Sequence, residues 1–178
     1  MTRMIPFHTV GCVTRGPTKA SIAVLVSLLL LAGSLLPAAA TPARAELQTF
    51  ERDSLVIETA SGARYPFTVE LALDRAQQAQ GLMFRRDLAP DAGMLFLYAR
   101  VREIAMWMKN TLIPLDMLFI ADDGRVVRIA ERTVPGSLET IPSGQPVAAV
   151  LELNGGTAAR LGLAPGDRVL HRSFGTAP

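Results

Sequence analysis

Short runs in which apolar and polar residues alternate, separated by turn-forming residues, constrain the fold of this chain most. Residues 64–73 alternate, with Phe67, Val69 and Leu71 on one face, and residues 54–59 show the same period. A period of two is what a half-buried strand requires. The further predicted strands cover residues 94–98, 103–108, 115–121, 125–134, 147–153 and 167–172. Many short strands at this spacing favour a sandwich or a barrel.

Two short helices complete the predicted domain. The first covers residues 75–80, because Asp74 is a favoured N-cap and Gly81 suits a left-handed C-cap. The second begins with Thr157 as its cap and ends at Gly162.

The Asp122-Asp123-Gly124 segment predicts a β-hairpin, because Asp-Gly suits the positive φ angles of a type I′ turn. We therefore expect a mainly β, compact sandwich-like or barrel-like domain with one or two short helices.

The N-terminal 45 residues have a different composition and predict a secretory signal peptide. Three basic residues precede a charge-free apolar run over residues 20–36, and small residues follow it. Positive, apolar and then small is the order that such a signal requires. We expect cleavage after Ala45, with Ala40 as the alternative, which leaves one domain over residues 46–178.

An uncleaved membrane anchor is the competing interpretation of the same segment. The seventeen residues of the apolar run are the lower limit for crossing a bilayer as a helix. Both interpretations deliver residues 46–178 to the outside of the cytoplasm, so we expect a periplasmic or secreted domain. Contact with a membrane is expected only through such an anchor.

Removal of the signal peptide reverses the sign of the net charge. Of 18 basic residues, four precede residue 46, so 14 remain against 16 acidic ones and the domain carries about −2. Nucleic-acid binding requires a basic face. We therefore expect no nucleic-acid partner.

Cysteine and histidine are nearly absent after residue 45, where His171 is the only member of either type. This composition excludes disulfides, thiolate catalysis and cysteine-rich zinc sites. A serine-histidine-aspartate triad would have to use His171, and no G-x-S-x-G motif occurs. We expect no cofactor, no metal and, on balance, no enzyme.

Five short segments in the expected order give this chain a specific resemblance. They are Gly81-Leu82-Met83-Phe84-Arg85, Gly93-Met94-Leu95-Phe96, Trp107-Met108-Lys109-Asn110-Thr111 with Pro114-Leu115-Asp116, Val150-Leu151-Glu152-Leu153, and Gly162-Leu163 to Gly166-Asp167. Over residues 55–171 the chain resembles domain-of-unknown-function family 192. The resemblance implies a compact β-sandwich-like fold that is often exported. It implies no established reaction.

Residues 103–109 predict a strand with two unlike faces. One face is apolar and is expected to join the core; its residues are Ile104, Met106 and Met108. The other face carries Trp107 between Glu103 and Lys109, the only lysine after residue 45. A flat aromatic ring beside charges suits a sugar-like ligand. The alternative is that Trp107 packs in the interior.

Asp116 and Glu152 are each a single carboxylate within an apolar strand. A buried charge without a partner costs several kcal/mol, so each should face solvent, a pocket or a cation. Arg85, Arg86 and Lys109 are the candidate cations. The alternative is a structural role, as an ion pair or as an acceptor for loop amides. The candidate ligand-binding residues are Arg85, Trp107, Lys109, Asn110, Asp116 and Glu152.

We expect a non-catalytic binding or accessory module of the cell envelope, with a small molecule, a glycan or an envelope protein as its partner. One alternative is a glycan hydrolase, with Asp116 and Glu152 as an acid–base pair some 5 to 9.5 Å apart. A second is a protein-interaction module with an exposed sheet edge. A weaker idea is Cu(I) binding by methionine sulfur, which in strands is more often core filler.

Overall fold

The computed structural model describes residues 47–176, which lie in one compact unit, Ala45–Pro178. The predicted signal peptide over residues 1–45, with cleavage after Ala45 or Ala40, lies outside the described residues. Within residues 47–176, no helix has the length and the apolar character needed to cross a membrane.

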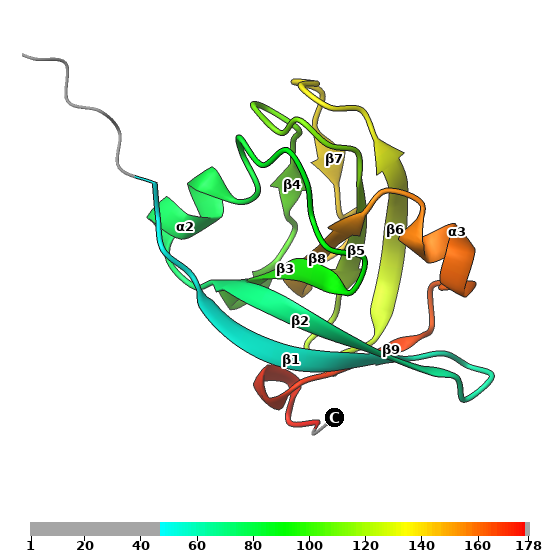
Figure 1. Ribbon diagram of the computed structural model, residues 1–178. Coiled ribbons are helices and arrows are strands. Elements are labelled where there is room, and N and C mark those ends of the chain that lie inside the picture. The colour runs from blue at the N-terminus through cyan, green and yellow to red at the C-terminus, as the bar shows by residue number, and fades with distance from the viewer. Residues whose placement is uncertain (1–46, 177–178) are drawn as a thin grey trace, which may run out of the picture. The chain divides into compact units, whose positions relative to one another are not determined.

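One seven-stranded sheet forms the body of the domain, in the order β6-β5-β8-β3-β2-β1-β9 (Figure 1). Its strands are β1 (Glu51–Glu58), β2 (Arg64–Ala72), β3 (Ala92–Arg102), β5 (Leu115–Ile120), β6 (Val126–Thr133), β8 (Val147–Asn154) and β9 (Arg168–Leu170). All neighbours are antiparallel except β2 and β3. A second sheet pairs only β4 (Ala105–Met106) with β7 (Ile141–Pro142).

The large sheet curls until its two edge strands meet. Arg125, directly before β6, bridges Arg168 of β9, and the Val126 amide donates to the Asp167 carbonyl at 2.8 Å. The Val169 amide donates to the Gly124 carbonyl over the same distance. The mainly β prediction is confirmed, and the single curled sheet has the barrel-like form of the two architectures that we expected.

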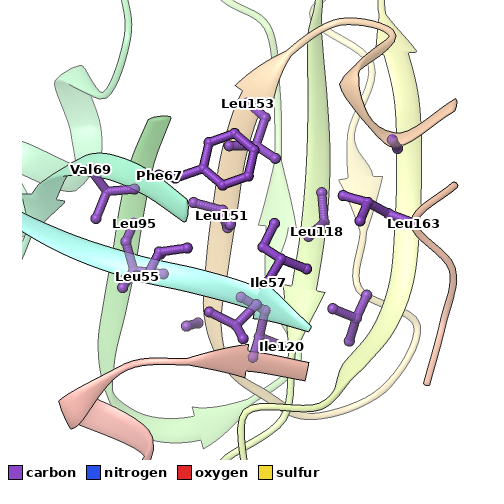
Figure 2. Packing of buried hydrophobic residues seen from close by; sticks show 14 of the residues in the cluster. Leu55, Ile57, Phe67, Val69, Leu95, Leu118, Ile120, Leu151, Leu153 and Leu163 are labelled. Atoms are coloured by element: carbon purple, nitrogen blue, oxygen red, sulfur yellow. The ribbon is translucent and has the colours of Figure 1, made fainter. Parts of the chain in front are cut away.

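Two apolar clusters occupy opposite faces of this sheet. The inner cluster, shown in Figure 2, includes Leu55, Ile57, Leu151 and Leu153. The second cluster is on the other face and joins β3, β5 and β8 to the segments around α2 and β4; it includes Met94, Phe96, Met117, Val150, Leu82, Ile104 and Met108. Every residue of β5 is buried, because this strand is covered on both faces. This double cover explains the nearly continuous apolar sequences of β5 and β8.

Helix α2 (Arg75–Gln80) begins and ends as predicted. The Asp74 carboxylate accepts from the Gln77 amide at 2.8 Å, and the Gln77 side chain reaches back to the Asp74 amide. This reciprocal pair is a capping box. Gly81 follows the helix at the predicted position, but its φ of 48° and ψ of −136° are not the left-handed helical conformation that we expected there.

Helix α3 (Thr157–Leu161) differs from the prediction at its start. Its N-cap is Gly156, which has no side chain to accept the free amides, and Thr157 is already inside the helix. Gly162 ends the helix in the left-handed conformation, as predicted. The last helical element, η1 (Arg172–Phe174), is a single 3₁₀ turn.

The predicted hairpin at residues 122–124 is present, but its turn type is not I′. Among its residues only Gly124 has a positive φ, at 84°, whereas a type I′ turn needs positive φ at both central positions. The Gly124 amide donates to the Ala121 carbonyl, and the register of β5 and β6 shifts beside the turn. This is the pattern of a three-residue loop that ends on a left-handed glycine.

The carboxylate of Asp116 supplies the cap that Gly156 lacks. Asp116 is fully buried; its Oδ1 accepts from the Gly156 amide at 2.9 Å and its Oδ2 from the Ala158 amide at 2.7 Å. Oδ1 also accepts from the Arg132 amide of β6 at 2.7 Å. A carboxylate has several lone pairs that can accept hydrogen bonds, and its negative charge stabilises a helix N-terminus. One side chain of β5 thus joins β6 and α3.

We predict that Asp116→Ala strongly destabilises the domain. Three amides would lose their acceptor, and a buried unpaired amide costs about 1–3 kcal/mol. Urea unfolding should show a loss of at least about 3 kcal/mol. The control Asp122→Ala, at an exposed turn position, should change stability by less than about 0.5 kcal/mol. Equal effects of the two substitutions would contradict the capping role.

Candidate functional site

A cavity of about 150 Å³ lies beside the second apolar cluster. Its walls come from the end of α2 and the loop that follows, from β3, from the segment around β4, and from β8. The side chains that define its chemistry are Met83, Tyr98, Arg102, Met106, Trp107, Thr111 and Glu152. This cavity therefore joins segments that are far apart in the sequence.

The pairing of β3 with β8 places Glu152 at the cavity. Met94 is opposite Glu152, and Phe96 is opposite Val150. Side chains two residues apart share one face of a strand, so Glu152 lies on the face that carries Phe96. Gly93 allows this close approach, because a Cβ there would lie 2.7 Å from the backbone oxygen of Glu152.

The same register separates Glu152 from Asp116. In the β5–β8 pair, Met117 is opposite Glu152, whereas Asp116 is opposite Leu153. This offset of one residue puts the two carboxylates on opposite faces of the sheet. The predicted glycosidase pair of Asp116 and Glu152 is therefore wrong, and the expected pocket does not include Asp116.

Glu152 is a buried carboxyl group without a partner among the described residues. Only 4% of it is exposed, and no hydrogen bond or ion pair to its side chain is formed within residues 47–176. Its cross-strand neighbours Met94 and Met117 are apolar and fully buried. Burial raises the pKa of Glu152 to about 8. At neutral pH the empty site thus holds a neutral acid, which has one O–H donor.

Tyr98 and Arg102 occupy the same cavity. The Tyr98 hydroxyl donates to Met106 Sδ at 3.4 Å. Burial, together with the charge of Glu152, raises the pKa of Tyr98, so the phenol stays protonated. The Arg102 guanidinium lies over the Tyr98 ring, 5.5 Å from its centroid, and Arg102 itself is exposed.

Trp107 is at the opening of the cavity. Its side chain is half exposed, which excludes the alternative of a fully interior position. The Lys109 ammonium lies 5.1 Å from the centroid of its ring, a cation–π contact. The predicted alternation of residues 103–109 is confirmed, although only Ala105–Met106 forms a strand: Ile104 and Met108 are buried, whereas Trp107 and Lys109 are exposed.

Two residues beside the cavity have left-handed backbone. Phe84 has a φ of 65° and Asn110 a φ of 56°. The Phe84 amide donates to the Asn110 carbonyl at 2.9 Å, which ties the loop after α2 to the loop after Trp107. Asn tolerates this conformation, whereas a bulky Phe is strained in it. Asn110 is therefore explained by its left-handed backbone and by its hydrogen bond to Phe84, without a ligand.

The remaining predicted residues are outside this cavity. Arg85 forms an ion pair with Glu70 and lines a separate cavity of about 300 Å³ beside β2 and β3. Lys109 and Asn110 line a shallow neighbouring cavity of about 490 Å³. Of the six predicted residues, only Trp107 and Glu152 line the cavity described above.

The sequence-based prediction missed Tyr98 and Arg102, and it considered the methionines at the cavity, Met83 and Met106, only as Cu(I) ligands or core filler. The alternation of β3 carries a signal for Tyr98, since Met94, Phe96 and Tyr98 share one face. Met83 and Met106 line the cavity, whereas Met94, Met108 and Met117 are buried in the core. Within residues 47–176, no three His, Cys, Asp or Glu side chains are grouped as a metal site would require.

His171, the candidate triad histidine, has structural contacts in the described part of the chain. Its Nε2 is 3.0 Å from Asp53 Oδ2, and the Ser173 amide donates to its Nδ1 at 3.2 Å. Ser173 makes this contact with its backbone amide and not with its hydroxyl group, which a catalytic triad would use. His171 thus ties the C-terminal turn to β1.

We predict that Glu152 makes stability fall as pH rises. The unfolded chain releases this proton near pH 4.5, whereas the folded protein holds it to about pH 8. Between these values the unfolded state binds fewer protons, so the free energy of unfolding decreases with pH. Each pKa unit corresponds to about 1.4 kcal/mol, so the total decrease is a few kcal/mol.

Urea unfolding from pH 5 to 9 measures this effect by comparison with Glu152→Gln. The variant should gain stability over the native chain as pH rises to about 8, with a constant difference above that value. Glu103→Gln, which removes an exposed acid, is the matched control and should follow the native curve. A constant difference between native chain and Glu152→Gln over the whole range would refute the raised pKa.

Comparison with solved structures finds close relatives of the same fold. One is described as a "putative transcription regulator" from Sinorhizobium meliloti 1021; it is 51% identical with a TM-score of 0.70 over 72% of this chain and 99% of that chain. Another, a protein of unknown function from Novosphingobium aromaticivorans DSM 12444, is 44% identical with a TM-score of 0.67, over 75% of this chain and 94% of that chain.

No curated protein matches the chain. A family model described as "Uncharacterized ACR" matches residues 56–171, which is most of the domain and agrees with the resemblance seen in the short segments. The chain belongs to domain-of-unknown-function family 192.

Proposed function

We propose that this domain is a non-catalytic binding module of the cell envelope that takes a small polar ligand in the Glu152 cavity. One observation carries the proposal: a carboxyl group that is 4% exposed lines a cavity and has no partner within residues 47–176. Such a group costs stability in the empty protein. A ligand that pairs with it recovers that cost.

The composition of the walls supports binding rather than reaction. Among the residues that line this cavity, Glu152 is the only Asp, Glu or His. General acid–base chemistry on a glycan uses two carboxyl groups. The candidate second group, Asp116, lies on the opposite face of the sheet and accepts hydrogen bonds from three backbone amides. A single buried acid in a cavity that aromatic rings also line is suited to holding a ligand in one orientation.

Location outside the cytoplasm is part of the same proposal. It rests on the charge-free run over residues 20–36, after basic residues and before small ones. The description of the Sinorhizobium relative does not lead us to propose a role in transcription. Residues 46–178 include 14 basic and 16 acidic residues, and this net negative charge disfavours binding to the phosphate backbone of a nucleic acid.

The alternative of strand addition at a sheet edge has less support. The edge strands β6 and β9 meet at the Arg125–Arg168 bridge, so part of each edge is already occupied. A partner strand needs a run of free backbone groups. We therefore favour the cavity.

The experiment is a ligand screen that uses Trp107 as its probe. Trp107 is the only tryptophan of the chain and is at the cavity opening, so occupancy should change its fluorescence. Small sugars, amino acids, muropeptides and anions would be tested on residues 46–178, with thermal shift in parallel, because a native-state ligand raises apparent stability.

We expect a saturable change in both signals for at least one class. Glu152→Gln should weaken that binding about tenfold or more, since hydrogen bonds to charged groups are worth about 1.5–3 kcal/mol. The exposed Glu103→Gln should bind as the native chain does. If no compound gives a saturable signal, or if Glu152→Gln binds with unchanged affinity, the proposal is wrong.

A further inference from the structure

We propose that the ligand of the Glu152 cavity is a small zwitterion of the amino-acid type, with its ammonium group at Glu152 and its carboxylate at Arg102. This inference rests on the proposed function and adds the chemical class of the ligand. It is carried by the position of one acidic and one basic side chain on the walls of the same cavity.

The buried end of the cavity favours an ammonium group. The Glu152 side chain accepts no hydrogen bond within residues 47–176, and an ammonium group offers three donors. The surrounding walls include the rings of Phe96, Tyr98 and Trp107, whose faces attract cations. A bound ammonium group favours the ionised form of Glu152, and because this carboxyl group is buried, the resulting pair is held more strongly than at the surface.

The exposed end favours a carboxylate. Arg102 uses one nitrogen, Nη1, to donate to the Glu103 carbonyl at 3.2 Å, and its guanidinium lies over the Tyr98 ring. The other guanidinium donors have no protein acceptor among the described residues. The fork of a guanidinium matches the two oxygens of a carboxylate. Stacking on Tyr98 holds this fork at the cavity rim.

The two charges together exclude simpler ligands. A ligand with only a positive charge would satisfy Glu152 but would be repelled by Arg102. A ligand with only a negative charge would satisfy Arg102 but would leave the buried Glu152 carboxyl group without a partner. A zwitterion satisfies both, and this double requirement is a source of specificity.

The size of the cavity agrees with this class. A cavity of about 150 Å³ in another protein accommodates benzene, so this one has room for a ligand core of a similar number of heavy atoms. Trp107 is half exposed at the opening. A longer side chain of the ligand can therefore extend over the tryptophan ring into solvent.

The test compares each zwitterion with its two half-charged analogues. Common free amino acids in both configurations would be titrated into residues 46–178, with Trp107 fluorescence and calorimetry as readouts. The tightest binder would then be compared with its decarboxylated amine and its deaminated acid. For leucine these are 3-methylbutylamine and 4-methylpentanoate. We expect each analogue to bind at least tenfold more weakly than the amino acid.

Two charge-neutralising variants separate the two ends of the ligand. Arg102→Gln should bind the amino acid and its amine with nearly equal affinity, because the carboxylate contact is lost. Glu152→Gln should bind the amino acid and its deaminated acid with nearly equal affinity. The controls Arg100→Gln and Glu103→Gln, at exposed positions near the cavity, should keep the native preference.

Several results would overturn the proposal. If the amine binds as tightly as its amino acid, Arg102 does not bind the ligand's carboxylate. If the deaminated acid binds as tightly as the amino acid, Glu152 does not bind the ligand's ammonium group. If no amino acid binds but another compound of the wider screen does, the proposed ligand class is wrong and the proposed binding function stands. If nothing binds in either experiment, both are wrong.

Discussion

The pairing of β5 with β8 decides which face of the sheet each of two buried carboxyl groups takes. Met117 is opposite Glu152 and Asp116 is opposite Leu153, so two carboxylates on neighbouring strands face opposite ways. Asp116 turns inward and becomes the acceptor that joins β6 and α3. Glu152 turns outward and lines a cavity without a partner in the described part of the chain. A slip of one residue between these strands would put both carboxylates on the same face of the sheet.

The segments that mark the family have separate physical functions around this pair. Gly93 lets β3 lie close to the backbone of Glu152. In the Trp-Met-Lys-Asn-Thr segment, Trp107 forms the cavity opening, Met108 is buried in the core, and Asn110 takes a left-handed turn that bonds to Phe84. Only Trp107 and Thr111 of this segment line the cavity, and the other residues support the surrounding structure.

Local signals in the sequence predicted much of the fold. The alternating runs gave seven of the nine strands closely, and Asp74 and Gly81 fixed both ends of α2. The prediction extended β4 from two residues to six and missed β7, which contains Pro142 and has only two residues. Thr157 was a plausible cap for α3, but the cap comes from Asp116, forty-one residues earlier in the chain. Contacts of this kind are not visible in local sequence.

The candidate site was only partly predictable for the same reason. Asp116 and Glu152 look alike in sequence, because each is one acid in an apolar strand. Only the register of two strands distinguishes a structural acceptor from a free carboxyl group, and register is a long-range property. Arg102 was missed because its role depends on stacking over Tyr98, which the sequence does not indicate. Alternation offered the exposure of Trp107 as one of two alternatives, and the structure agrees with it.

The most direct measurement of the central claim is a carbon-13 NMR titration of the Glu152 carboxyl group, assigned by its absence in Glu152→Gln. We expect a midpoint near 8, because the group is buried and unpaired. We also expect a bound cation to shift this midpoint downward, since an opposite charge favours the ionised form. A midpoint near the ordinary value of 4.5 in the empty protein would show that Glu152 is solvated or paired. That result would contradict the claim that a free buried acid defines the site.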